Sequence, residues 1–210
     1  SVDAYYRYNF ANADDGFNSN NYTSFTNSQS SFALGMASIR ADASALSGKV
    51  TATADLGFGP RAQEFSYSEA TDNTTLAMVK QMFISYAVSD KVKLTAGKFA
   101  THIGYEVVDP FLNKNYSMSY MFTNGPFSHT GLKAEITKGK HGFMVGVANP
   151  TDYRVLPTGQ INKKFVIAQY SLAASDKVNI FVNYVGGQSP DSSKSQQFDA
   201  VVTAKISNKF

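Results

Sequence analysis

The 210-residue chain contains no cysteine and no tryptophan, and only 17% of its residues are charged. Without cysteine there can be no disulfide scaffold, thiolate zinc site or cysteine nucleophile. The charged fraction lies below the roughly 25% of ordinary soluble domains, yet no apolar run approaches the roughly 18 residues of a membrane-spanning helix. The net charge of +3 comes without a basic cluster, so nucleic acid is not an expected partner. These absences favour an all-β protein, either soluble or inserted in a membrane.

Apolar and polar residues alternate along most of the chain, which is the pattern of half-buried strands. In one example the apolar phase consists of Val50, Ala52, Ala54, Leu56 and Phe58. The same alternation covers 2–10, 82–88, 92–96, 132–136, 143–147, 178–184 and 198–206, while 32–39 and 165–172 are strand-like with two apolar faces. No comparable stretch has a helical period with capping residues. We therefore expect about ten strands.

A four-residue pattern, Ser followed by Gly, Asp or Asn, then Lys, then Val or Phe, punctuates these strands. It begins at Ser47, Ser89, Ser175 and Ser207, with a variant at 138–140. Gly, Asp and Asn tolerate the positive φ of two-residue hairpin turns, so each copy predicts a tight reversal. Between these turns lie long connections rich in Asn, Ser, Gly, Asp and Pro, at 11–30, 60–73, 100–125, 149–163 and 187–195.

Strict alternation of short and long connections distinguishes between the all-β architectures. Outer-membrane barrels place short turns at the periplasmic end and longer loops outside, and strands of about 9 to 11 residues match a tilted membrane crossing. Several aromatic residues stand near strand ends, where interfacial girdles belong: Tyr6, Tyr8, Phe10, Phe58, Tyr86 and Tyr184. The prediction is an antiparallel up-and-down transmembrane β-barrel. The alternative is a soluble β protein whose aromatic residues fill its core.

The predicted domain is a single β-barrel domain over 1–210, the N-terminal part of a longer barrel. Because 207–210 repeats a pattern that opens a strand elsewhere, Phe210 is expected to begin a further strand. A complete ten-stranded barrel ending at Phe210 is the alternative. The chain begins at Ser1 without methionine or an apolar signal segment, which indicates a processed or trimmed product.

The region from Leu94 to Ala134 resembles the OmpL-like β-barrel porins of Gram-negative outer membranes. The matching pieces are Gly97-Lys98-Phe99, Ile103-Gly104-Tyr105-Glu106, Asn115-Tyr116-Ser117, Gly125-Pro126-Phe127, His129-Thr130-Gly131 and, earlier, Leu56-Gly57-Phe58-Gly59-Pro60-Arg61. The resemblance implies a porin-like barrel in the bacterial outer membrane, and it supplies no catalytic residues.

The alternation also predicts which side chains face the lumen and which face lipid. The pore-lining candidates, from the strands and the connection 100–125, are Asp3, Arg7, Lys49, Asp55, Lys93, Glu106, Asp109, Lys133 and Glu135. Both signs of charge are present, so no strong ion preference is predicted. Lys93, Lys133 and Asp199 are expected to face the lumen and tolerate polar replacement, whereas the apolar phase predicted to face lipid includes Leu94, Ile136, Val182 and Val202.

The connection 100–125 is long enough to fold into the lumen as a constriction, or to remain an external loop. His102 and His129, near Glu106 and Asp109 in sequence, could in principle serve a hydrolase, although ordinary polar loop residues explain them better. Gly57-Phe58-Gly59 is only part of a nucleotide-binding fingerprint, and it is expected to end a strand with no helix after it.

Three classes of function follow from these observations. The leading prediction is a channel for passive diffusion of small hydrophilic solutes. The second is a structural or partner subunit of a larger outer-membrane complex, and the third, an enzyme, is the least favoured. The expected partners are outer-membrane lipids and, beyond them, other outer-membrane proteins or further copies of the chain. No metal and no cofactor are expected.

Overall fold

The computed structural model describes residues 1–10, 24–28, 30–66, 79–153, 155–156, 163–189 and 192–206. Its elements are β1 (Val2–Arg7), β2 (Ser31–Ala45), β3 (Val50–Phe58), α1 (Pro60–Phe65), β4 (Val79–Ser89), β5 (Val92–Ala100), the 3-10 turn η3 (Pro110–Leu112), α2 (Tyr120–Asn124), β6 (Ser128–Lys138), β7 (His141–Ala148), β8 (Phe165–Ser175), β9 (Val178–Gln188) and β10 (Lys194–Ala204). No helix in the described ranges is both long enough and apolar enough to cross a membrane.

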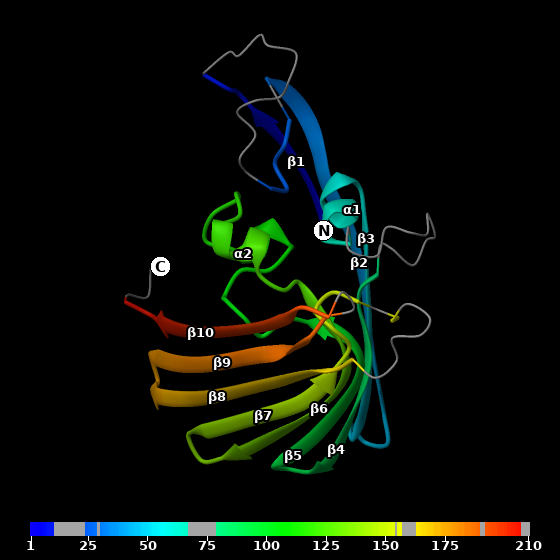
Figure 1. Ribbon diagram of the computed structural model, residues 1–210, viewed down its shortest axis with the longest axis vertical. Coiled ribbons are helices and arrows are strands. Elements are labelled where there is room, and N and C mark those ends of the chain that lie inside the picture. Colours follow the sequence, from blue (N-terminus) through cyan, green and yellow to red (C-terminus); the bar gives the residue numbers. More distant parts are fainter. Residues whose placement is uncertain are drawn as a thin grey trace. The chain divides into compact units, whose positions relative to one another are not determined.

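The strands form one ten-stranded antiparallel sheet in chain order, from β1 at one edge to β10 at the other. Figure 1 shows β5 to β10 side by side, each next to its neighbour in the sequence. This is the meander that the alternation of short turns and long connections predicts, so the expected all-β, up-and-down class and strand number are confirmed.

The chain divides into two compact units. The first contains Ser1–Arg40, Asp55–Lys80 and Glu106–Gly125, and the second contains Ala41–Ala54, Gln81–Tyr105 and Pro126–Phe210. Strands β2, β3 and β4 contribute residues to both units, and the connection after β5 passes from the second to the first at Glu106.

Two copies of the repeated turn pattern lack the positive φ that the sequence predicts for them. Positive φ occurs at Leu46, Ser47 and Gly48, and at Gly139, but not in the turns 90–91 and 176–177. In those turns the register shifts by one residue, and the Ser89 and Ser175 hydroxyls accept the amide N–H groups two residues later, both at 3.3 Å. The serine therefore stabilises the turn locally. The fourth copy, 207–210, lies outside the described residues.

The expectation that no helix follows Gly59 is wrong. Helix α1 begins at Pro60, whose fixed φ suits the first helical turn. Gly59 has φ of +110°, and a Cβ there would lie 2.9 Å from the Gly35 carbonyl oxygen, so glycine is needed at this bend. With only six residues, α1 is too short to produce a periodic apolar pattern in the sequence. Most of the expected connections 11–30 and 60–73 lie outside the described ranges.

Candidate pore-lining surface

The second unit has an exposed apolar outer face, and an inner face that combines polar and charged side chains with a buried apolar cluster. Backbone pairing aligns one row across the outer face, Leu94, Ala134, Val145, Ala168, Tyr184 and Phe198. The adjoining row on the inner face consists of Lys93, Glu135, Met144, Gln169, Asn183 and Asp199. Outer-face side chains remain exposed even when they are large: Leu94 is 37% exposed and Phe198 74%. A soluble domain buries such residues, so this distribution is inverted.

The exposed outer face includes all four residues of the predicted lipid-facing set. Ile136, Val182 and Val202 are 43%, 48% and 63% exposed, and each shares the outward phase of its strand. Their contact with lipid remains a prediction. In the first unit, the outward phase of β1 and β2 is exposed in the same way at Val2, Tyr6, Phe32 and Leu34.

Charged residues on the inner face of the second unit form a cluster towards the start of β5 and the end of β6, near the short turns. The Lys93 ammonium lies 2.9 Å from the Glu135 carboxylate, and the Lys133 ammonium lies 3.6 Å from the same group. Lys133 also stands 4.8 Å from the centre of the Phe99 ring. Lys93 and Glu135 are partly exposed, so solvent reaches this cluster.

Neutral amides continue the row across β8, β9 and β10. Gln169 donates to Asn183 at 2.7 Å, and Asn183 donates to the Asp199 carboxylate at 2.8 Å. Asp199 also accepts the Gly104 amide N–H at 2.8 Å. A shorter side chain at position 199 would lose both hydrogen bonds that Asp199 accepts. The predicted tolerance of polar replacement therefore applies only to residues that carry an acceptor at a similar distance from the backbone.

The beginning of the long connection, 101–105, packs on this inner face. Ile103 joins a buried apolar cluster with Met144, Phe165, Ile167, Val185 and Phe99. His102 Nε2 lies 2.9 Å from the Tyr184 carbonyl oxygen, and burial lowers the pKa of His102. His129 Nε2 lies 3.0 Å from the Thr101 hydroxyl. Neither histidine hydrogen-bonds a carboxylate among the described residues, so the pairing that a hydrolase would need is not formed there.

In the first unit, a buried lysine holds two of the predicted residues together. The Lys80 ammonium lies 3.0 Å from the Asp55 carboxylate and 2.7 Å from that of Asp109. It also donates to the Ser38 hydroxyl at 3.0 Å. The side chains of Lys80 and Asp55 are only 3% and 5% exposed. The network joins the connection 106–125 to the inner side of β2 and β3.

A second network in this unit centres on Asp3. Its carboxylate accepts the Tyr116 hydroxyl at 2.5 Å and the Met36 amide N–H at 2.8 Å. Arg61 from α1 is fully buried, lies 3.8 Å from Asp3, and stacks 5.0 Å from the centre of the Tyr116 ring. Desolvation and the hydrogen bond to Asp3 raise the pKa of Tyr116 to about 12, so its hydroxyl stays protonated and donates.

The remaining predicted residues occupy separate places. Glu106 accepts the Ser119 amide N–H at 3.0 Å and the Ser119 hydroxyl, and Ser119 in turn caps α2. Arg7 donates to the Thr26 carbonyl oxygen at 2.8 Å. Lys49 is exposed in the short turn 46–49. The structure therefore brings together Asp55 with Asp109, and Lys93 with Lys133 and Glu135.

Sequence reasoning missed Lys80 and Arg61. In an alternating strand Lys80 would lie on the same face as Met82 and Ile84, which are exposed on the outer face. Alternation therefore did not predict an inward-facing Lys80. Arg61 lies in a helix that was not expected. Their carboxylate partners, Asp55 and Asp3, were the only sequence signal for them. The described residues contain no group of three or more His, Asp or Glu side chains placed to hold a metal ion.

Comparison with known proteins identifies one family. A family model described as "Putative beta-barrel porin-2, OmpL-like" matches residues 1–210, which is the whole chain. No curated protein matches the chain. The resemblance noted between Leu94 and Ala134 is thereby confirmed and extended to the full length.

Proposed function

The chain belongs to the family of OmpL-like β-barrel porins, and from this membership we propose that it forms an outer-membrane channel for passive diffusion of small hydrophilic solutes. The bacteria would be Gram-negative, as the resemblance implies. A porin family supports a channel rather than an enzyme as the basic role.

The observation that carries the proposal is the contrast between the two faces of each strand. Adjacent residues such as Leu94 and Lys93 point to opposite sides, one exposed and apolar and the other paired with a carboxylate. In a transmembrane barrel the apolar phase contacts lipid and the polar phase lines the lumen. The same contrast at Ala4 and Asp3 extends the argument to the first unit.

We further propose that the connection 100–125 narrows the lumen. In the second unit, 101–105 lies on the inner face through Ile103 and the hydrogen bond from Gly104. In the first unit, Asp109 and Tyr116 bind Lys80 and Asp3 on the side opposite the exposed apolar residues. These contacts hold both parts of the connection against the side of the strands opposite the exposed apolar residues, which supports an inward position.

The charges of this connection favour weak ion selectivity. Asp109 is held by Lys80, which it shares with Asp55, and Glu106 accepts hydrogen bonds from Ser119, so both carboxylates of the connection bind groups of the protein itself. Selectivity in pores comes from charges that meet the permeating solute. The inner-face cluster of the second unit contains both signs, with Glu135 paired to Lys93 and to Lys133.

Planar-bilayer recording on the purified full-length protein tests the proposed channel. Stepwise conductance, together with swelling of proteoliposomes in small sugars, is expected. If correctly inserted protein gives neither conductance nor swelling, the channel is ruled out and a structural subunit of a larger outer-membrane complex becomes the better explanation. Trypsin resistance and antiparallel-sheet circular dichroism would show that the inserted protein is folded.

A further inference from the structure

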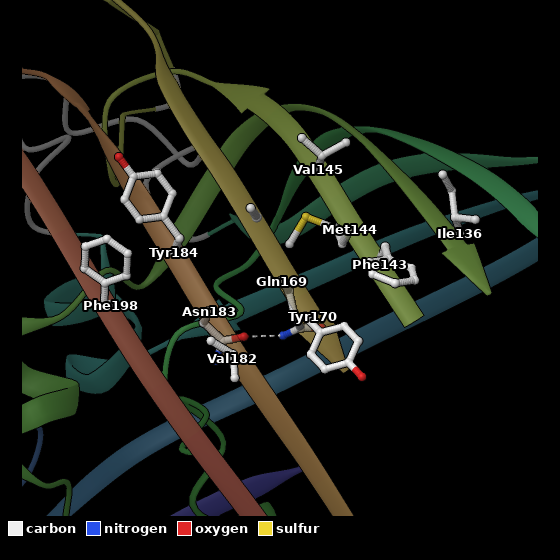
Figure 2. A pocket seen from close by; sticks show the side chains of 11 residues that line it. Ile136, Phe143, Met144, Val145, Gln169, Tyr170, Val182, Asn183, Tyr184 and Phe198 are labelled. Carbon is white, nitrogen blue, oxygen red and sulfur yellow. Dashed lines mark hydrogen bonds between the residues drawn. The ribbon is translucent and has the colours of Figure 1, made fainter. Parts of the chain in front are cut away.

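A groove crosses the apolar outer face of the second unit over β6 to β10. It has a volume of about 390 Å³, and its wall includes Phe143, Val145, Tyr170, Val182, Tyr184 and Phe198. Figure 2 shows these side chains on their strands. Ala168 also belongs to the lining. Ala168 pairs with Val145 on one side and Tyr184 on the other. Its methyl group between two larger neighbours accounts for the hollow.

The walls of the groove are held by ring contacts rather than left loose. Phe143 and Tyr170 have ring centres 5.4 Å apart, and Tyr184 and Phe198 have theirs 4.9 Å apart. Both distances lie in the range preferred by aromatic pairs. Two aromatic pairs on neighbouring strands therefore form the walls of a preformed, almost wholly apolar groove along the outer face.

One end of the groove is polar and positively charged. The Tyr170 hydroxyl lies 2.8 Å from His141 Nδ1, and His141 pairs in register with Lys138. The Ala173 amide N–H donates to the Lys140 carbonyl oxygen at 2.9 Å, which places the turn 139–140 against β8. Lys138, Lys140 and His141 are all exposed.

The neighbouring turns strengthen this positive character. The Thr137 amide N–H donates to the Lys91 carbonyl oxygen, so Lys91 stands beside the same strand end, and Lys177 occupies the next turn after β8. Only Asp90 and Asp176 supply negative charge in these two turns. Across the described part of the chain, no ion pair joins Lys91, Lys138, Lys140 or Lys177 to a carboxylate.

We propose that this groove binds one anionic phospholipid, with an acyl chain along the aromatic walls and the phosphate at Lys138, Lys140 and His141. The inference rests on the proposed barrel, because only then does the outer face meet lipid while the short turns meet headgroups. An acyl chain matches the apolar lining, and a phosphate matches the uncompensated lysines at one end only. A zwitterionic lipid such as phosphatidylcholine carries the same phosphate, but its ammonium group is repelled by the lysines, so an anionic lipid is favoured.

Native mass spectrometry of the full-length, detergent-extracted protein tests the proposal, with palmitoyl-oleoyl phosphatidylglycerol and the corresponding phosphatidylcholine as probes. We expect one phosphatidylglycerol to bind more tightly than phosphatidylcholine. Ala168→Phe fills the groove and should weaken that binding about tenfold or more, through the lost burial of acyl methylenes. The matched control, Ala96→Phe on β5, changes an exposed outer-face alanine away from the groove and should bind as the unaltered protein does.

The double variant Lys138→Gln/Lys140→Gln tests the headgroup separately on surface positions that do not affect folding. Each lysine should contribute about fivefold to phosphatidylglycerol affinity, with phosphatidylcholine binding unchanged. Lys163→Gln/Lys194→Gln, at the opposite strand ends, is the control. Three results would overturn the proposal: equal affinity for the two lipids, an equal loss of binding in the two alanine variants, or an undiminished preference for phosphatidylglycerol in Lys138→Gln/Lys140→Gln. Equal affinity for the two lipids is also what we expect if the lysines bind an acidic protein instead.

The proposed channel and the proposed lipid site can be contradicted independently of each other. Absence of conductance with a retained phosphatidylglycerol preference would contradict the channel alone. Conductance without lipid preference would contradict the lipid site alone.

Discussion

Lys80 is the residue whose removal the first unit should tolerate least. Its ammonium forms ion pairs with two carboxylates, those of Asp55 and Asp109, while itself almost fully buried. Lys80→Met leaves Asp55 buried without a partner, and breaking a buried ion pair from one side costs about 3–5 kcal/mol. Urea unfolding in detergent micelles, followed by circular dichroism, should show this loss in the free energy of unfolding.

The partly exposed pair Lys93 and Glu135 provides the control for Lys80. Half of the Lys93 side chain is accessible, and solvent screens such a pair, so Lys93→Met should cost less than about 1 kcal/mol. Equal losses for Lys80→Met and Lys93→Met would mean that the network around Lys80 is not a buried one.

Asp152 should make the free energy of unfolding depend on pH. Burial raises its pKa to about 6 from the ordinary 3.8, against the lowering effect of N–H groups from Ser128 and Phe127, which donate at 2.7 and 2.8 Å. The folded state therefore holds the proton more tightly than the unfolded state. The free energy of unfolding should fall as the pH rises from about 4 to about 6, by at most about 3 kcal/mol, and then level off.

Asp152→Asn keeps an oxygen acceptor for both N–H groups and removes the titration. The variant should lose the slope between pH 4 and pH 6, measured by urea unfolding at a series of pH values. A slope that survives in Asp152→Asn would assign the pH dependence to another group.

At the scale of the strand, β5 offers a direct test of the two faces. Leu94 and Lys93 are adjacent, and alternation sends them to opposite sides. Leu94→Arg should cost about 2–4 kcal/mol if its side chain meets the bilayer midplane, and less near an interface. Lys93→Arg retains the charge beside Glu135 and should be nearly neutral. Unfolding from lipid vesicles measures both, and equal tolerance of arginine at the two positions would contradict the membrane-spanning assignment of β5.

Serine and glycine stabilise the hairpin turns in different ways. The turns after Ser89 and Ser175 use the serine hydroxyl and a register shift, whereas 46–49 and 139–140 use positive φ. One sequence pattern thus codes for a tight reversal by two local routes. Both routes close antiparallel hairpins, as the pairs β4–β5, β6–β7 and β8–β9 show.

For the whole molecule, the long connection is the part most closely tied to solute passage. Replacing 113–123 by a short Gly-Ser link removes α2 and Tyr116 but leaves Asp109 to pair with Lys80. If this connection narrows the lumen, conductance and the rate of sugar-driven liposome swelling should rise on the order of twofold or more. Tyr116→Phe, which keeps the segment and removes one hydrogen bond to Asp3, should change conductance far less. Unchanged flux in the shortened variant would place the segment outside the path of the solute.

The sequence by itself determined the strand number, the positions of the turns and the face on which most residues lie. These features are local, because side chains alternate with a period of two and turn residues act within four positions. Leu94, Ile136, Val182 and Val202 were assigned to one phase for this reason, and all are exposed. Asp55 and Lys93 were likewise recognised as inner-phase residues without knowledge of their partners.

Only the tertiary structure decided which charges meet. Lys80 binds Asp109, 29 positions away, and Tyr116 binds Asp3, 113 positions away, and no pattern of period two relates such residues. Arg61 depends on a six-residue helix that carries no periodic signal. The groove around Ala168 likewise arises from strand register, which places one small side chain between Val145 and Tyr184. Long-range packing selects these contacts because burying a charge or an aromatic ring is favourable only when a partner from elsewhere in the chain completes its surroundings.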